Sequence, residues 1–157
     1  MQKNKGFTLL EMMTVIAIVA IVSAIAIPNL ISYATTYRLR SAARDVYSNL
    51  QEARTKAVQQ NTRWAVNFSA SGYQVINCGP DNDCSSATAS DDITVKTIVV
   101  GQDYPGITMV QTFSGSQIAF TSEGTCDASA AGNITFTNAK GKTATVTVSA
   151  SGAITSS

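Results

Sequence analysis

The feature that most constrains this chain is an uninterrupted apolar run from Phe7 to Ile27, in which Glu11 is the only ionisable side chain. A helix over these residues would be about 31 Å long, which matches the roughly 30 Å hydrocarbon core of a bilayer. A secretory signal peptide has a shorter apolar region that ends in an Ala-x-Ala-like site, whereas here a helical pattern continues past Ile27. We therefore expect residues 7–27 to span a membrane once.

The charges on either side of this run predict its orientation. Lys3 and Lys5 precede it, and the next arginines lie ten or more positions beyond Ile27. Basic flanks remain on the cytoplasmic side of a membrane. We therefore expect a single-pass membrane protein with a cytoplasmic N-terminus and an extracytoplasmic C-terminal domain.

Residues 28–61 continue the helical period with one apolar face. Pro28 cannot donate to the carbonyl of Ala24, so it should bend the helix or loosen one turn. Beyond it, apolar residues recur at spacings of three and four: Leu39, Ala43, Val46, Leu50, Ala53 and Ala57. Glu52 and Lys56 form a favourable i,i+4 pair. We expect one helix from Phe7 to about Gln60, with its later part amphipathic.

From residue 63 to the C-terminus at residue 157 the apolar period changes to two, as in half-buried strands. The expected strands are Arg63–Phe68, Tyr73–Asn77, Ile93–Val100, Ile107–Thr112, Gln117–Thr121, Asn133–Thr137 and Lys142–Val148. The expected core aromatic residues are Trp64, Phe68, Tyr73, Phe120 and Phe136. Residues 138–141 and 149–152 have the composition of turns in a C-terminal meander. These patterns predict the α+β class, with a long N-terminal helix packed on a C-terminal antiparallel β-sheet.

Composition argues against most enzymatic chemistry. The chain has 157 residues, a formal net charge of +1 and no histidine. Without histidine, Ser-His-Asp and Cys-His catalytic sets and His-ligated catalytic zinc sites are excluded. There is no P-loop glycine pattern and no paired CxxC. We expect neither an enzyme nor a cofactor, and a membrane-tethered enzyme that uses a Ser-Lys pair is the open alternative.

The start of the apolar run carries a specific motif. The string Lys5-Gly6-Phe7-Thr8-Leu9-Leu10-Glu11 closely resembles the prepilin peptidase motif of type IV pilin-like proteins. The resemblance implies that residues 1–6 are a leader, that cleavage follows Gly6, that Phe7 is N-methylated and that Glu11 acts in assembly. It also implies the partners: a prepilin peptidase, other pilin or pseudopilin subunits, and an inner-membrane assembly platform.

The physical chemistry of Glu11 is consistent with that role. An unpaired carboxylate in hydrocarbon costs several kcal/mol, so a cation at the same depth should accompany it. Cleavage behind Gly6 would place the ammonium of Phe7 one helical turn away, and a neighbouring subunit could offer the same group. The alternative is that Glu11 only complements the positive end of the helix dipole, worth about 0.3–1 kcal/mol.

A second stretch narrows the resemblance. Residues 50–61, LQEARTKAVQQN, followed by a strand, are similar to the helix end of the minor pilin and pseudopilin family that includes type II secretion protein H. The resemblance implies the lollipop shape of pilins and a structural, minor subunit of a type IV pilus or a type II secretion pseudopilus. A filament-tip binding module for DNA uptake or adhesion is the alternative. The sequence departs from the family in having Gly152-Ala153 where Gly-Arg is common.

The three cysteines suggest one disulfide. Cys78 and Cys84 enclose a five-residue turn that would bring them within bridging distance. Three alternatives stay open for Cys126. It is a buried free cysteine, it replaces one of the other two in the disulfide, or it marks a redox-sensitive contact. The Ser-, Asp- and Ala-rich loop between Cys78 and Asp92 should be mobile. A calcium loop of Asp81, Asp83, Ser85 and Asp92 is an alternative use of the same segment, although Ser86 stands where such a loop needs glycine.

Nucleic acid is not an expected partner. Residues 63–157 carry only four basic residues, Arg63, Lys96, Lys140 and Lys142. Seven acidic residues oppose them: Asp81, Asp83, Asp91, Asp92, Asp103, Glu123 and Asp127. Non-specific DNA affinity needs several cationic contacts to phosphates. The C-terminal domain should therefore repel a polyanion.

Overall fold

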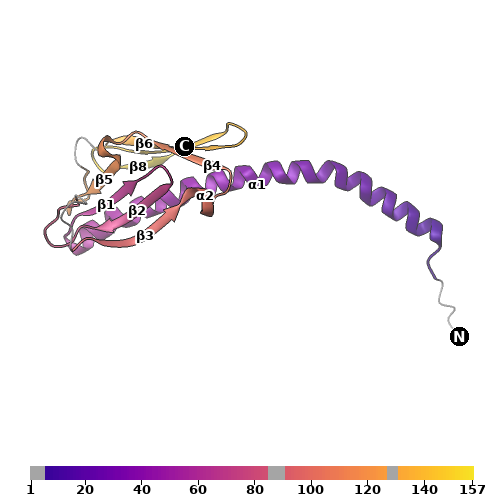
Figure 1. Cartoon of the computed structure of the whole chain (residues 1–157), viewed down its shortest axis with the longest axis horizontal. Coiled ribbons are helices and arrows are strands. Elements are labelled where there is room, and N and C mark those ends of the chain that lie inside the picture. Colours follow the sequence, from indigo (N-terminus) through magenta and orange to yellow (C-terminus); the bar gives the residue numbers. More distant parts are fainter. Residues whose placement is uncertain (1–5, 85–90, 127–130) are drawn as a thin grey trace. The chain divides into compact units, whose positions relative to one another are not determined.

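The computed structural model describes residues 6–84, 91–126 and 131–157, and it divides into two compact units (Figure 1). The first unit is Met1–Ala34 and the second is Thr35–Ser157. Residues 85–90, the middle of the loop between Cys78 and Asp92 that we expect to be mobile, lie outside the described residues, and the mobility of this loop stays a prediction.

The first unit consists of the beginning of helix α1, which runs from Leu9 to Gln60. Its side chains are almost all exposed, and they include large apolar residues along the whole length of the unit. Among the described residues, α1 is the one helix long and apolar enough to cross a membrane, and its most apolar stretch has no buried residue. Pro28 lies inside α1, where the Ser32 hydroxyl donates to the Pro28 carbonyl at 3.0 Å. The bend expected at Pro28 stays a prediction.

In the second unit the apolar stripe of α1 is buried. All six stripe residues expected from the sequence are buried, together with Ala42 and Asn49. Val46, Leu50, Ala53 and Ala57 are wholly inaccessible to solvent. The alanines keep this face of the helix thin, so that strands can approach it closely. The predicted amphipathic helix is therefore confirmed over residues 39–57.

Eight strands follow in the described part of the chain, and they form two four-stranded antiparallel sheets. One sheet has the order β3-β2-β1-β5, with β1 at Trp64–Phe68, β2 at Gly72–Asn77, β3 at Ile93–Val99 and β5 at Gln117–Phe120. The other has the order β4-β6-β7-β8, with β4 at Ile107–Gln111, β6 at Gly132–Asn138, β7 at Thr143–Val148 and β8 at Ile154–Ser156. The seven predicted strands are confirmed to within one residue at each end, whereas the single sheet that we expected is in fact two.

Three further elements differ from the expectation. Val100, predicted to end a strand, begins the short helix α2 (Val100–Asp103), and the 3-10 turn η1 (Ser114–Ser116) precedes β5. The hydroxyl of Tyr104, directly after α2, donates to the Asp45 carboxylate on α1. That contact holds the chain close to α1 after α2. A strand that continued straight past Val99 would instead run away from the helix. The strand β8 was not predicted, since three residues are too few to establish a period.

A single hydrophobic cluster joins α1 to both sheets. It contains the helix stripe and the inward residues of strands from each sheet, including Trp64, Phe68, Tyr73, Phe120 and Phe136. All five predicted core aromatic residues are therefore buried. Turns at Asn138–Gly141 and Ser149–Gly152 close the last two hairpins, each by a backbone hydrogen bond of 2.9 Å. Both predicted turns are confirmed.

Candidate functional site

The predicted processing site lies at the entry to α1. Gly6 is exposed, and a Cβ atom added there would meet nothing within 4 Å among the described residues. Phe7 is also exposed, with 75% of its surface accessible. No contact in the described part of the chain therefore accounts for a glycine or an aromatic residue at these positions, and both are accessible to another protein.

Thr8 forms the N-cap of α1. Its hydroxyl oxygen accepts the backbone N–H of Glu11 at 3.3 Å, and its carbonyl accepts the N–H of Met12 at 3.2 Å. Thr8 and Glu11 have the Thr-x-x-Glu spacing of a capping box, a signal that was readable in the sequence. The Glu11 side chain is exposed in the first turn of the helix. This position is consistent with favourable dipole compensation and also leaves the carboxylate accessible to a partner.

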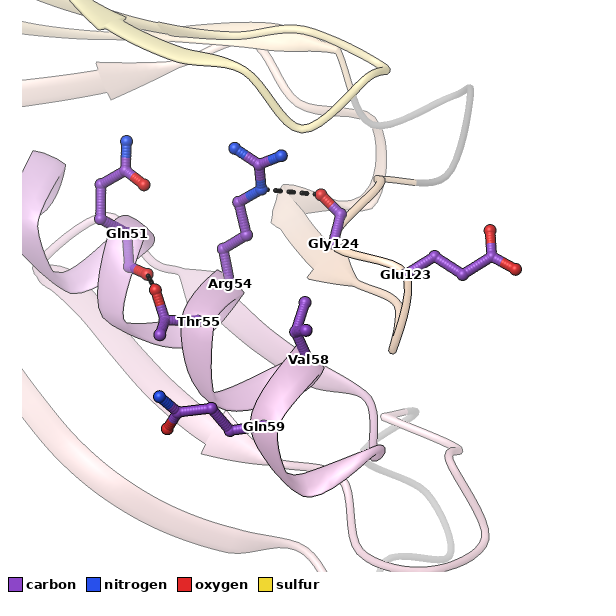
Figure 2. Close-up of a pocket in the computed structure, with 7 residues that line it drawn as sticks. All are labelled: Gln51, Arg54, Thr55, Val58, Gln59, Glu123 and Gly124. Carbon is purple, nitrogen blue, oxygen red and sulfur yellow. Dashed lines mark hydrogen bonds between the residues drawn. The ribbon is translucent and has the colours of Figure 1, made fainter.

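A groove lies beside the last turns of α1 (Figure 2). It has a volume of about 440 Å³ and is lined by Gln51, Arg54, Thr55, Val58, Gln59, Glu123 and Gly124. The Arg54 Nε donates to the Gly124 carbonyl at 2.8 Å. This groove has no signal in the sequence, because it joins helix residues to a loop about seventy positions later in the chain.

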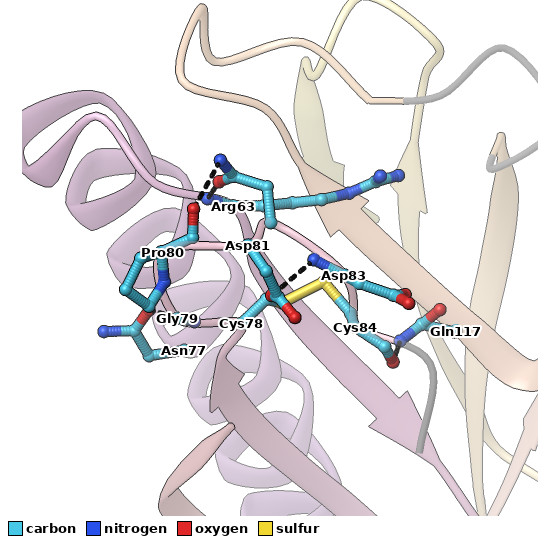
Figure 3. Close-up of a disulfide and its surroundings, with 10 residues drawn as sticks. Arg63, Asn77, Cys78, Gly79, Pro80, Asp81, Asp83, Cys84 and Gln117 are labelled. Atoms are coloured by element: carbon cyan, nitrogen blue, oxygen red, sulfur yellow. Dashed lines mark hydrogen bonds between the residues drawn. A yellow bond between two sulfur atoms is a disulfide. The ribbon is translucent and has the colours of Figure 1, made fainter. Parts of the chain in front are cut away.

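A disulfide joins Cys78 and Cys84 (Figure 3). Both cysteines lie in a small buried cluster with Ala65 and Ala119, which face each other across β1 and β5. The small alanine side chains leave room for the bridge on this face of the sheet. Asn82 fixes the loop to the start of β1, since its side-chain oxygen accepts the N–H of Arg63, the residue before that strand, at 2.6 Å.

Cys126 lies in the main core and not in the disulfide cluster. It is buried with α1 and the inward faces of the sheets, whereas Cys78 and Cys84 belong to the separate cluster. The structure therefore does not place Cys126 in a bridge with either of them. No group of three or more potential metal-ligating side chains occurs in residues 6–84, 91–126 and 131–157, and Ser85 and Ser86 of the suggested calcium loop lie outside these ranges.

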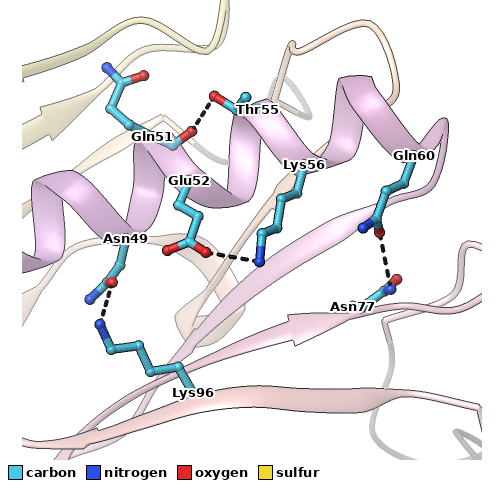
Figure 4. Close-up of polar contacts among 8 residues, drawn as sticks. All are labelled: Asn49, Gln51, Glu52, Thr55, Lys56, Gln60, Asn77 and Lys96. Atoms are coloured by element: carbon cyan, nitrogen blue, oxygen red, sulfur yellow. Dashed lines mark hydrogen bonds and ion pairs between the residues drawn. The ribbon is translucent and has the colours of Figure 1, made fainter.

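Polar contacts fix α1 against the sheet β3-β2-β1-β5 (Figure 4). Asn49 is buried, with 3% of its surface exposed; its amide donates to the Tyr73 hydroxyl at 2.7 Å, and its carbonyl oxygen accepts from Lys96 at 2.9 Å. Burial raises the pKa of Tyr73, so its hydroxyl stays protonated. The predicted Glu52–Lys56 pair is confirmed at 2.9 Å. Hydrogen bonding to Lys56 lowers the pKa of Glu52.

Comparison with known protein families shows which family this chain belongs to. The family model of the type II transport protein GspH matches residues 42–152. The chain belongs to this family. The prokaryotic N-terminal methylation motif matches residues 1–27, the segment that contains the candidate processing site. GspH-family proteins are minor pilins and pseudopilins, which are structural subunits and not an enzyme family.

Solved structures of low sequence identity have the same fold. The type IV minor pilin FimU of Pseudomonas aeruginosa has a TM-score of 0.59 at 17% identity, over 78% of this chain and 90% of that chain. The minor pseudopilin EpsH from the type 2 secretion system of Vibrio cholerae has a TM-score of 0.54 at 12% identity, over 76% and 96%. These likenesses confirm the predicted fold class.

One curated relative matches this chain over only a short stretch of both sequences. The type IV major pilin protein PilA of Myxococcus xanthus is 45% identical over 49 residues, which are 31% of this chain and 20% of that protein. The matched stretch thus spans a fifth of the relative. It adds a pilin to the proteins that this GspH-family member resembles.

Proposed function

We propose that this GspH-family protein is a structural, minor subunit of a type IV pilus or a type II secretion pseudopilus. In this proposal residues 1–6 are a leader, and residues 7–27 first span the inner membrane and then form the filament core. Residues 28–61 are the amphipathic helix, and residues 63–157 form the periplasmic domain. Cleavage behind Gly6 and N-methylation of Phe7 precede assembly, and the partners are a prepilin peptidase, other pilin-type subunits and an inner-membrane assembly platform.

The observation that carries the proposal is the exposed apolar part of α1 with its single carboxylate. No residue between Leu9 and Val22 is buried, so the apolar surface of this helix is available to lipid or to other helices. Glu11 is the only ionisable side chain of that surface, and it stands in the first turn of the helix, four residues after Phe7. In a filament core, the N-terminal ammonium of a neighbouring chain would compensate this carboxylate.

Glu11→Ala tests the proposal. In cells that make the filaments, we expect the variant to be inserted and processed like the wild type, because Gly6 and Phe7 are unchanged. Its amount in the sheared filament fraction should fall at least about tenfold, the effect of losing 1.4 kcal/mol or more of pairing free energy. Thr14→Ala is the matched control, since Thr14 is a polar residue of the same segment whose hydroxyl bonds only to the Glu11 backbone carbonyl. Normal incorporation of Glu11→Ala would remove Glu11 from assembly.

A further inference from the structure

Arg54 holds a positive charge in the groove without an anionic partner in the described part of the chain. Its side chain is half-buried, and no carboxylate of residues 6–84, 91–126 and 131–157 lies within ion-pair distance of it. Glu123 lines the same groove, but Figure 2 shows its carboxylate directed away from the guanidinium. The groove therefore contains a cation that the described residues do not neutralise.

Two glycines keep the space beside Arg54 open. Gly124 and Gly152 have φ values of 75° and 77°, which favour glycine. A Cβ atom at Gly152 would lie 2.2 Å from the Gly124 carbonyl oxygen and 3.3 Å from the Arg54 Nε. A Cβ atom at Gly124 would lie 3.1 Å from a methyl carbon of Val58. The side chain of Arg54 thus occupies a gap that only glycine on both sides allows.

The hydrogen bond to Gly124 orients the guanidinium. Because Nε is used by the Gly124 carbonyl, the two terminal nitrogens remain, and in Figure 2 they point away from that bond. A pair of parallel N–H donors of this kind matches the two oxygens of a carboxylate. The rest of the lining offers amide and hydroxyl groups from Gln51, Thr55 and Gln59 and an apolar surface from Val58.

We propose that this groove binds the side-chain carboxylate of an acidic segment on a neighbouring pilin-type subunit, an inference that rests on the proposed function. A volume of about 440 Å³ accommodates a few side chains of such a segment. Glu123 at the rim disfavours a polyanion such as a nucleic acid or a multiply charged phosphate, whereas a single carboxylate can pair with Arg54 on the side from which the Glu123 carboxylate is directed away. Arginine is also enriched among the residues that dominate the energetics of protein interfaces.

The first test follows the Arg54 side-chain Nε–H resonance of the full chain in neutral detergent micelles. The probe is N-acetylglutamate with an amidated C-terminus, which has one side-chain carboxylate, and the controls are the corresponding glutamine compound and inorganic phosphate. We expect a saturable shift with the carboxylate probe, none with the glutamine compound, and a smaller one with phosphate. No shift, or an equal response to phosphate, would overturn the proposal. This test needs no assembled filament, so it is independent of the proposed function.

The second test identifies the occupant in cells. A photo-crosslinking residue at Gln59, on the groove, should give an adduct with another pilin-type subunit, at a peptide that contains Asp or Glu. Arg54→Gln should reduce that adduct at least about tenfold. Arg44→Gln, which changes an exposed arginine on the same helix, should leave it unchanged.

The thermal midpoint of each purified variant is measured in parallel. A purely structural Arg54 would lower the midpoint without changing the crosslinked peptide in the remaining folded protein. An adduct that is insensitive to Arg54→Gln, or one made to lipid or nucleic acid, contradicts the proposal. A chain absent from filaments, but positive in the first test, would instead contradict the proposed function.

Discussion

Asn49 shows at the scale of single residues how a polar side chain can be necessary in an apolar stripe. It lies on the buried face of α1 and bonds to both Tyr73 and Lys96. Buried polar groups destabilise a fold unless they are hydrogen-bonded, so the buried side chains of Asn49 and Tyr73 depend on one another, and exposed Lys96 satisfies the Asn49 carbonyl oxygen. Asn49 was not predicted from the sequence, because a polar residue within an apolar period is ordinarily assigned to the solvent side.

Replacing Asn49 tests this dependence. Asn49→Ala should lower the free energy of unfolding by about 1–3 kcal/mol, since it leaves the buried Tyr73 hydroxyl without its partner. In the Asn49→Ala, Tyr73→Phe double variant the loss should be smaller than the sum of the single losses. Urea unfolding followed by Trp64 fluorescence measures all three variants, with exposed Ser48→Ala as the control. Strictly additive losses would show that the two side chains do not depend on one another.

Asp92 predicts a pH dependence of stability. Burial, and then the nearby carboxylates of Asp91, Asp81 and Asp83, raise the pKa of Asp92. Its Oδ1 is buried without a hydrogen-bond partner among the described residues. A carboxyl whose pKa is higher in the folded state binds more protons there, so stability falls as the pH rises from the ordinary value of Asp through the raised one.

Asp92→Asn should therefore be more stable than the wild type at neutral pH, and this difference should vanish below the ordinary pKa of Asp, about 3.9. Thermal midpoints across this range are the measurement. Glu123→Gln, at an exposed carboxylate, serves as the control. A wild type as stable as Asp92→Asn at neutral pH would show that the Asp92 carboxylate is fully compensated in the folded state.

At the scale of elements, α1 has one helical period but two environments. In residues 39–57 its apolar stripe is covered by both sheets, whereas its apolar residues before Val22 are exposed on every side. An amphipathic pattern is typical of the first environment and an all-apolar one of a lipid-facing or helix-packed segment. The change in pattern along one helix is therefore what allowed the two segments to be separated from sequence alone.

Leu50 tests the packed part of the helix. Leu50 is 0% exposed in the core, so Leu50→Ala should destabilise the protein by about 2–5 kcal/mol through lost burial and a cavity. Val58, two turns later on the same helix, is 51% exposed, and Val58→Ala should change stability by less than about 0.5 kcal/mol. Urea midpoints of both variants check this. Equal losses would mean that the two positions are buried alike in solution.

Helices and strands were predictable where a local apolar period determines them. The pairing of strands into sheets was not, because it depends on residues far apart in the chain. Alternation located seven strands, but it does not state which strands pair, so two sheets were taken for one. The four residues of α2 and the three of β8 are too short to give a period. The Thr8 cap had a readable signal, whereas the Arg54 groove depends on residues that only the folded chain brings together.

At the scale of the whole molecule, the charges of the second unit argue against nucleic-acid capture. Lys140 lies in the turn between β6 and β7 and Lys142 directly follows it, but residues 63–157 carry only four basic residues against seven acidic ones. With so few phosphate contacts, the protein should bind duplex DNA no tighter than about 10⁻⁴ M at physiological salt. A mobility-shift assay with the micelle-held chain measures this. Micromolar binding that Lys140→Ala with Lys142→Ala abolishes would favour DNA capture over a purely structural role.

The central claim is that a peptidase cleaves this chain behind Gly6 and that its new N-terminus is methylated for assembly. Intact mass spectrometry of the protein from its native membrane, or from filaments, tests it most directly. We expect a mass that begins at Phe7 and exceeds that of the unmodified chain by one methyl group in place of hydrogen, with the methyl group located on the Phe7 nitrogen by fragmentation. A mature N-terminus beyond Ala20, as a signal peptidase would produce, would contradict the proposal.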